Sequence, residues 1–277
     1  MTYYLNHSEW YSTKYIPEGM NVDMVNNDHR TQQLLMPAIT KSAKDKVFID
    51  LGCGTGMLGL HALKHGAKFV YFVEQDVQMC HILENVFKNK LDPDKYKIIS
   101  KEITLLEESD FDKGVPEIVV SEFFGPGLFD EGYVHYTKQI RMIFPEIQFI
   151  PETFKIKLYL NKIDYTQPIW PKDSELLDHF KFMYKEKGFA RMISVEENDL
   201  VGTIEFNANT RQFDDSVTFE YTKDEDLLLV GVANVEHEEF IQHFTVIGWF
   251  MSKDEKGKKF KIHIDTDNYF NPAKVEL

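Results

Sequence analysis

Cysteine is scarce in this sequence, and long apolar runs are missing. Only 2 of the 277 residues are cysteine, which excludes a disulfide framework and a paired-cysteine metal site. No window approaches the run of about 18 apolar residues that a membrane-spanning helix requires. The stretch MTYYLNHSEWYSTKY lacks the basic and apolar blocks of a signal peptide. We therefore expect a soluble protein of the cytoplasm or nucleus, with no membrane partner and no metal.

Positive charge is the other shortage. The chain has 31 Lys and Arg against 45 Asp and Glu, which gives a formal net charge of −14. Nucleic-acid phosphates attract basic proteins, so this balance disfavours direct nucleic-acid binding and favours basic partners. The same acidity also serves solubility alone. With 43% hydrophobic residues, the chain can bury one large core or two smaller ones.

Strands and helices alternate in the first half of the chain. The apolar runs predict strands at 47–51, 69–76, 96–100 and 117–122, with helices at 57–66 and 77–90 between the first three. Alternation of this kind predicts an α/β fold with a doubly wound parallel sheet, the Rossmann-like class. A further helix is predicted from about residue 23 to 40, and we expect Pro37 to kink or end it.

After residue 150 the pattern changes to extended runs with period-two alternation. FKIKLYLNKI, SVTFEY and FTVIGWFMS are examples, and they predict antiparallel strands of a small barrel or sandwich. Pro145 and Pro151 bracket the change. We predict amino-terminal helices with a Rossmann-like cofactor-binding domain over residues 1–150, and a β-rich, barrel-like substrate domain over residues 151–277.

A glycine-rich loop follows the first strand directly, with Gly52, Gly54 and Gly56 at alternate positions. Glycine allows the backbone to approach a nucleoside cofactor closely. GTGMLG also fits the G-x-G-x-x-G fingerprint of dinucleotide folds, in which a helix N-terminus faces a pyrophosphate. Asp50 at the strand tip, with no basic residue near it in the sequence, conflicts with a pyrophosphate. It suits the sulfonium and ammonium groups of S-adenosyl-L-methionine, with a dinucleotide as the alternative.

Two more residues belong to this predicted cofactor site. Glu74 ends the next strand 18 residues after Gly56, where an acid would accept the two ribose hydroxyls of the cofactor. Taken alone, Glu74 could equally be a solvated strand-end carboxylate. Cys53 lies inside the loop, and we expect it to fill space against the cofactor.

A pair of glutamates follows the strand at 117–122. Glu122 ends this strand, and Glu131 comes nine residues later across a loop that contains glycine and proline. In a doubly wound sheet this strand end opens into the same crevice as the cofactor loop. A guanidinium is planar, always charged and rich in donors, so two converging carboxylates suit it well. The alternative is a pair of solvated loop charges.

Several of these segments resemble the protein arginine methyltransferase family. SEFFGPGLFDE (121–131) has the spacing of the family's double-glutamate loop, and residues 47–74 resemble its cofactor segment. The resemblance covers roughly residues 10 to 250. It implies a Rossmann-like domain followed by a β-barrel that is shortened here. It also implies methyl transfer from S-adenosyl-L-methionine to arginine side chains of a basic protein or peptide.

The resemblance assigns individual residues as well. MVNNDHRT (24–31) is similar to the helix whose arginine holds the cofactor carboxylate, and Tyr15 matches an aromatic motif that covers the cofactor. HFTVIGWF, which begins at His243, is similar to the family's threonine-histidine-tryptophan loop. The cofactor contacts implied in this way are Tyr15, Met24, Arg30, Ile103 and Thr104.

The expected mechanism is an in-line displacement, in which positioning carries much of the catalysis. Glu122 and Glu131 would draw the guanidinium charge toward the nitrogens they contact, so that the remaining nitrogen becomes more nucleophilic. His243 is the predicted proton acceptor, and a packing role in the β-rich domain is its alternative.

Two other functions stay open from the sequence. One is a class I methyltransferase that acts on another protein side chain or on a small cationic amine. The other is a catalytically silent protein that holds basic peptides in the same crevice. The sequence also leaves open whether the chain forms a homodimer.

Overall fold

The computed structural model describes residues 28–124, 131–162, 189–191, 199–264 and 273–276. Contacts divide the chain into two compact units, which we call the first and the second unit. The first unit comprises Met1–Glu122, Lys138–Pro151 and His237–Phe240, and the second comprises Phe123–Thr137, Glu152–Glu236 and Ile241–Leu277.

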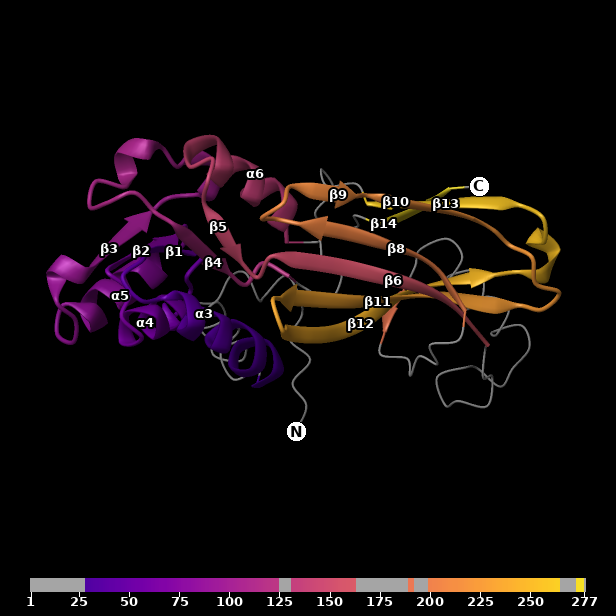
Figure 1. Cartoon of the computed structure of the whole chain (residues 1–277), viewed down its shortest axis with the longest axis horizontal. Coiled ribbons are helices and arrows are strands. Elements are labelled where there is room, and N and C mark those ends of the chain that lie inside the picture. Colours follow the sequence, from indigo (N-terminus) through magenta and orange to yellow (C-terminus); the bar gives the residue numbers. More distant parts are fainter. Residues whose placement is uncertain (1–27, 125–130, 163–188, 192–198, 265–272, 277) are drawn as a thin grey trace. The chain divides into compact units, whose positions relative to one another are not determined.

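A five-stranded sheet with the order β3-β2-β1-β4-β5 forms the centre of the first unit (Figure 1). Its strands are β1 (Val47–Leu51), β2 (Phe69–Glu74), β3 (Tyr96–Ser100), β4 (Ile118–Ser121) and β5 (Gln148–Ile150). Every neighbouring pair is parallel. The central strand β1 is buried along its whole length, as expected for a strand covered on both faces. The predicted Rossmann-like class is confirmed.

Helices α3 (Met36–Ser42), α4 (Met57–Lys64) and α5 (Val77–Phe87) lie on one side of this sheet (Figure 1). Asp76 caps α5, because its side chain accepts from the amides of Gln78 and Met79. Gly66 follows α4 with a φ of 92°, a conformation that favours glycine and ends the helix as predicted. The other helices are η2 (Pro93–Lys95), η3 (Ile103–Leu105), η4 (Glu108–Asp110) and α6 (Tyr133–Ile143).

The helix before β1 differs from the prediction. A π-helix, η1 (Asp28–Leu35), runs directly into α3, and Pro37 lies in the first turn of α3. Proline is tolerated there because first-turn amides have no intrahelical partner. Pro37 therefore does not end the helix, which continues to Ser42, and it marks the change from π-helical to α-helical geometry instead.

Close packing brings α4 against the sheet. A Cβ atom added at Gly59 would lie only 2.4 Å from the ring of Phe72 in β2, so only glycine fits at this position without movement. Phe72 is fully buried and packs on Phe87 of α5, with 4.9 Å between ring centroids. The last glycine of GTGMLG thus serves helix–sheet packing, the role of the third glycine in related loops.

The second unit is antiparallel. It contains a six-stranded sheet with the order β7-β12-β11-β6-β8-β9 and a three-stranded sheet with the order β10-β13-β14. A Cβ atom at Gly202 of β8 would lie 2.4 Å from Val217 of β10, so the two sheets approach each other closely. The predicted β-rich, barrel-like architecture is confirmed. The strands are β6 (Thr153–Lys162), β7 (Phe189–Arg191), β8 (Leu200–Asn207), β9 (Gln212–Asp214), β10 (Ser216–Glu220), β11 (Leu227–His237), β12 (Phe240–Met251), β13 (Lys259–Ile264) and β14 (Ala273–Glu276), and the short helix η5 (Lys253–Glu255) lies between β12 and β13.

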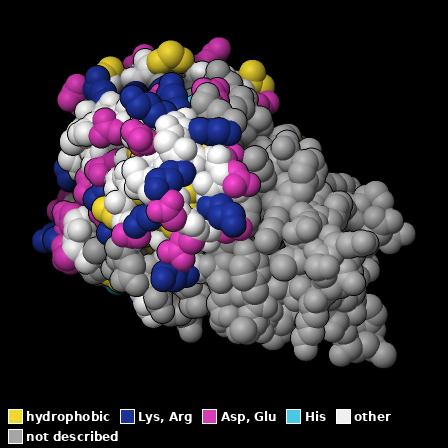
Figure 2. Space-filling view, turned by 90° about the vertical axis from the view of Figure 1, so that its right-hand side faces the viewer, with side chains coloured by type: hydrophobic (Ala, Val, Ile, Leu, Met, Phe, Trp, Pro, Cys, Tyr) yellow, Lys and Arg dark blue, Asp and Glu magenta, His cyan; other side chains and the backbone are white. Residues whose placement is uncertain are grey.

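Acidic and basic side chains are interspersed on the face shown in Figure 2. Ion pairs of the second unit join Lys223 to Asp199 and Lys256 to Asp224, each at 2.7 Å. Exposed pairs of this kind contribute little to stability, but they mix the two signs of charge over the surface. The net charge of the chain is therefore not gathered into a uniform acidic field over the described part of this face.

Candidate active site

Three carboxylates come together at the carboxyl edge of the parallel sheet. In the strand register, Leu51 of β1 is level with Val73 of β2 and with Ser121 of β4. Continued by one residue, this register places Glu74 and Glu122 level with the first glycine of the loop. Side chains two residues apart on a strand share a face, so both glutamates lie on the same face as Asp50.

Asp50 is the buried member of this group, with only 1% of its surface exposed. Its Oδ2 accepts a hydrogen bond of 2.7 Å from the amide of Gly59, in the first turn of α4. The pKa of Asp50 is raised to about 8, chiefly by burial and to a smaller extent by the charges of Glu122 and Glu74, while the hydrogen bond from the Gly59 amide acts in the lowering direction. Asp50 thus ties the strand tip to the helix, and its burial favours the protonated form of the carboxyl.

Glu74 is half-buried and holds the glycine loop. Its Oε2 accepts from the amide of Gly54, and its Oε1 accepts from the amide of Asp76, both at 2.9 Å. Each carboxylate oxygen has about two acceptor positions, so Glu74 keeps capacity for two hydroxyl donors. This orientation is compatible with the predicted role of Glu74 at a ribose.

The glycine loop has the geometry that its sequence demands. Gly52, Gly54 and Gly56 have φ values of 66°, 50° and 75°, in the left-handed region that favours glycine. The amide of Cys53 donates to the carbonyl of Val73 at 2.9 Å, which joins the loop to β2. Burial, followed by the charges of Asp50 and Glu74, raises the pKa of the Cys53 thiol well above its usual range. A buried neutral thiol agrees with the predicted space-filling role rather than with a nucleophile.

Glu122 follows the last residue of β4 and is half-buried. Its Oε1 accepts a hydrogen bond of 3.1 Å from the hydroxyl of Thr31, in η1. Thr31 is 1% exposed, so this contact between residues far apart in the sequence lies inside the first unit. The charge of Glu122 contributes to the raised pKa of Asp50, so the two side chains lie close enough to interact electrostatically.

Glu131 belongs to the second unit, and residues 125–130 of the loop between the two glutamates lie outside the described residues. The ends of that loop are anchored on Phe154 of β6. Its ring lies 5.8 Å from that of Phe124 and 4.1 Å from that of Tyr133, measured between centroids. Glu131 itself is exposed. Its convergence with Glu122 therefore stays a prediction.

The other predicted site residues are placed in part. Tyr15 and Met24 lie outside the described residues, and for Arg30 and His243 the structure describes the backbone, in η1 and β12 respectively. Ile103 and Thr104 form part of η3, where the hydroxyl of Thr104 donates to Glu102 at 2.9 Å. Their cofactor contacts remain predictions.

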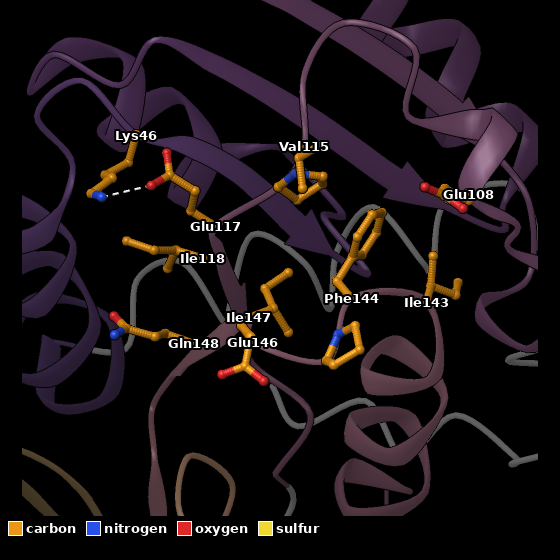
Figure 3. Close-up of a pocket in the computed structure, with 12 residues that line it drawn as sticks. Lys46, Glu108, Val115, Glu117, Ile118, Ile143, Phe144, Glu146, Ile147 and Gln148 are labelled. Carbon is orange, nitrogen blue, oxygen red and sulfur yellow. Dashed lines mark hydrogen bonds and ion pairs between the residues drawn. The ribbon is translucent and has the colours of Figure 1, made fainter.

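A pocket of about 550 Å³ lies at the opposite, amino-terminal edge of the sheet. Lys46 and Glu117, the residues before β1 and β4, form an ion pair of 2.6 Å at its rim (Figure 3). Ligands of open α/β sheets bind outside the carboxyl ends of the strands, so this pocket is not the candidate active site. Its apolar lining comes from Val115, Pro116, Ile118, Ile143, Phe144 and Ile147.

Among the residues that the structure describes, no group of three or more His, Cys, Asp or Glu could hold a metal ion. Nor does any helix in the described ranges have the length and apolar character needed to span a membrane.

Known proteins are similar to this chain in part of its sequence and, separately, in its fold. A family model described as "Conserved hypothetical protein 95" matches residues 28–118. Protein arginine N-methyltransferase 1 of Chlamydomonas reinhardtii is 35% identical over 127 residues, which is 45% of this chain and 35% of that protein. A crystal structure of PRMT6 has a TM-score of 0.71 at 17% identity and covers 96% of this chain and 100% of that chain.

The chain is related to the protein arginine N-methyltransferases. The resemblance found in the sequence is thereby confirmed, and the likeness to PRMT6 shows the fold. The Trypanosoma brucei PRMT1 enzyme-prozyme heterotetrameric complex with AdoHcy also matches, with a TM-score of 0.56 at 18% identity over 91% of this chain and 88% of that chain. The matched regions span 35, 61 and 45% of the first three curated relatives.

The sequence analysis gave no role to Thr31, which belongs to this site. Thr31 ends the MVNNDHRT segment, yet its contact with Glu122 joins residues 91 positions apart. A threonine directly after the predicted cofactor-binding arginine was the only available signal. That signal names no partner, since any buried polar group elsewhere in the chain could accept its proton.

Proposed function

We propose that this protein transfers a methyl group from S-adenosyl-L-methionine to arginine side chains of basic proteins or peptides. The main support for this proposal is the cluster of Asp50, Glu74 and Glu122 beside a glycine loop, where a sheet of this class binds its ligand. A sulfonium donor and a guanidinium acceptor are both cations, and carboxylates such as those of Glu74 and Glu122 attract cations, whereas Asp50 holds the strand tip to α4. The names of the relatives support the same chemistry.

Four parts of the first unit would hold the cofactor. Glu74 presents two oriented oxygens to the ribose hydroxyls, and the backbone of Gly52 and Gly54 permits close approach. Arg30 would pair with the cofactor carboxylate. We further assign Tyr15 and Met24 as cofactor cover, and Ile103 and Thr104 as adenine contacts. When bound, S-adenosyl-L-methionine supplies an electrophilic methyl carbon.

The acceptor would be held by the two glutamates. Glu122 and Glu131 would each accept guanidinium N–H groups, and their charge would draw the cation's positive charge toward those two nitrogens. The third nitrogen would then bond to the methyl carbon of the cofactor from the side opposite the carbon–sulfur bond, which would break and leave S-adenosyl-L-homocysteine. His243 would take the released proton.

The division of labour between the halves of the chain belongs to this proposal too. Residues 1–150 would bind the cofactor, and residues 151–277 would bind the substrate protein. The net charge of −14 favours a basic, arginine-containing partner through long-range attraction. Self-association into a homodimer is a further possibility that size measurements in solution would test.

The proposal is tested by the residue that becomes methylated. The protein is incubated with labelled S-adenosyl-L-methionine and, in parallel, with arginine-rich peptides, their arginine-to-lysine versions and small amines. Label on arginine, located by mass spectrometry, is the expected result. Label on another side chain or on an amine would replace this function with a different methyltransferase activity.

Thermal unfolding with each cofactor separates the remaining alternatives. A ligand that binds only the folded state raises the unfolding temperature, so S-adenosyl-L-methionine should raise it while NAD leaves it unchanged. Cofactor binding without any methylated product would indicate a silent binder of basic peptides. A response to NAD alone would indicate a dinucleotide enzyme.

A further inference from the structure

We infer that Thr31 is a positioning residue for Glu122 in the reaction proposed above, on which this inference rests. The hydroxyl of Thr31 donates to Oε1 of Glu122 at 3.1 Å. Hydrogen bonds to a charged acceptor are about twice as strong as neutral ones, and this one is shielded from water because Thr31 is 1% exposed. The contact therefore restrains the orientation of the carboxylate.

Two acidic side chains lie near Glu122. Asp50 lies close enough for the charge of Glu122 to raise its pKa, and Glu74 acts on Asp50 in the same way. Carboxylates in a partly buried site repel one another, and the Thr31 hydroxyl is one contact that holds Glu122 against that repulsion. A hydroxyl donor opposes that repulsion without adding a positive charge that would compete with a guanidinium substrate.

The bond to Thr31 uses only part of the acceptor capacity of the Glu122 carboxylate. Two carboxylate oxygens offer about four acceptor positions, and Thr31 occupies one of them. Because Oε1 is held in place, the direction of the other oxygen is fixed relative to β4. Preorganised acceptors of this kind contribute to the transition state because they need no rearrangement during the reaction.

Thr31 itself is carried by a well-anchored segment. Leu34 and Leu35 of η1 are fully buried, and η1 continues into α3. The hydroxyl of Thr40 in α3 lies 2.8 Å from Nε2 of His61 in α4. The segment also contains Arg30, the proposed partner of the cofactor carboxylate. The adjacent residues Arg30 and Thr31 would therefore position the methyl donor and, through Glu122, the guanidinium that accepts the methyl group.

The test compares substitutions that keep or remove the hydroxyl. Thr31→Val has nearly the same shape but no donor, whereas Thr31→Ser keeps the donor. The matched control is Thr137→Val, because Thr137 is also buried but donates only to the Val134 carbonyl in its own helix. Methylation of an arginine peptide is measured at several concentrations of peptide and cofactor, together with thermal unfolding.

Thr31→Val should lower kcat by about ten- to a hundredfold, the usual effect of losing one hydrogen bond to a charged group. KM for the cofactor should change little, Thr31→Ser should restore most of kcat, and Thr137→Val should keep it. An unchanged kcat in Thr31→Val overturns the inference and leaves the proposed function intact. So does an equal loss in Thr31→Ser and Thr31→Val, since the hydroxyl would then not matter. Absence of arginine product from the wild type overturns the proposed function and this inference together.

Discussion

The two edges of the parallel sheet are built from the same strands and have opposite electrostatic character. At the carboxyl edge, Asp50 is buried, carries a raised pKa of about 8 and shares its surroundings with Glu74 and Glu122. At the amino edge, Glu117 is paired with Lys46 at 2.6 Å, and both side chains are more than 40% exposed. The carboxyl edge thus gathers acidic groups where water is scarce, whereas the amino edge pairs its acid with a lysine in solvent.

The electrostatically unfavourable groups of this sheet therefore lie at its carboxyl edge. Buried carboxylates with shifted pKa values are costly to a folded protein and cluster at functional sites. An exposed ion pair contributes little and needs no functional explanation. The pocket lies at the amino edge, whereas the residues of the proposed active site lie at the other end of the strands.

Substitution of one glutamate at each end of β4 tests the difference between the two edges most directly. Glu122→Gln should lower kcat by about a hundred- to a thousandfold, because the amide cannot draw the guanidinium charge. Cofactor affinity should stay within a few fold. Glu117→Gln, at the other end of the strand, is the matched control and should leave kcat unchanged. Both are checked by peptide methylation kinetics and by calorimetric titration with cofactor. Equal kcat values for the two variants would remove Glu122 from the chemistry.

The buried acid predicts a pH dependence of stability. The pKa of Asp50 is about 8 when folded, against an ordinary value near 3.8. The folded state therefore holds the proton more tightly, so the contribution to stability is complete below about pH 3.8 and is lost as the pH rises through about 8. Asp50→Asn removes this loss. Its free energy of unfolding should therefore exceed that of the wild type by a growing margin between those pH values.

Denaturant unfolding at a series of pH values measures this difference directly. The Asn side chain keeps an oxygen for the Gly59 amide, so the helix contact is preserved in the comparison. Parallel stability curves for the two proteins would show that Asp50 is not a protonated, buried acid.

The packing of α4 on the sheet gives a smaller expected effect. Gly59→Ala places a methyl group 2.4 Å from the buried ring of Phe72. Overpacking of this kind costs roughly 1 to 3 kcal/mol, and it should also disturb the amide that Asp50 accepts from. We expect a lower unfolding temperature together with weaker cofactor binding. A stability equal to that of the wild type would mean that α4 can shift without cost.

The smallest effect is expected at the amino edge. Lys46→Gln breaks the pair with Glu117, and exposed pairs are worth less than about 1 kcal/mol. The difference from the wild type should shrink further in high salt, because mobile ions screen exposed charges. Thermal unfolding at low and high salt checks this. A large, salt-independent loss would show that the pair is structural.

Much of the architecture was readable from local patterns in the sequence. The strands were found because apolar, β-branched runs end at glycine or acidic residues, and α4 was found because Gly66 stops it. Asp50 and Glu74 were identified because each lies at a strand end beside the loop. The sequence left open whether Pro37 kinks or ends the helix, because its effect depends on its position within the helical turn, and the structure places it where π-helix changes to α-helix.

Periodicity and backbone sterics act over a few residues. They made three features predictable from local sequence patterns: the order of the elements, the glycine loop and the residue types at the strand ends. The contact of Thr31 with Glu122 and the raised pKa of Asp50 emerge from the folded chain alone. Both depend on strand register and burial, which arise when segments many residues apart pack together. The same packing set the amino-edge pocket, whose lining comes from around the starts of β1, β4 and β5.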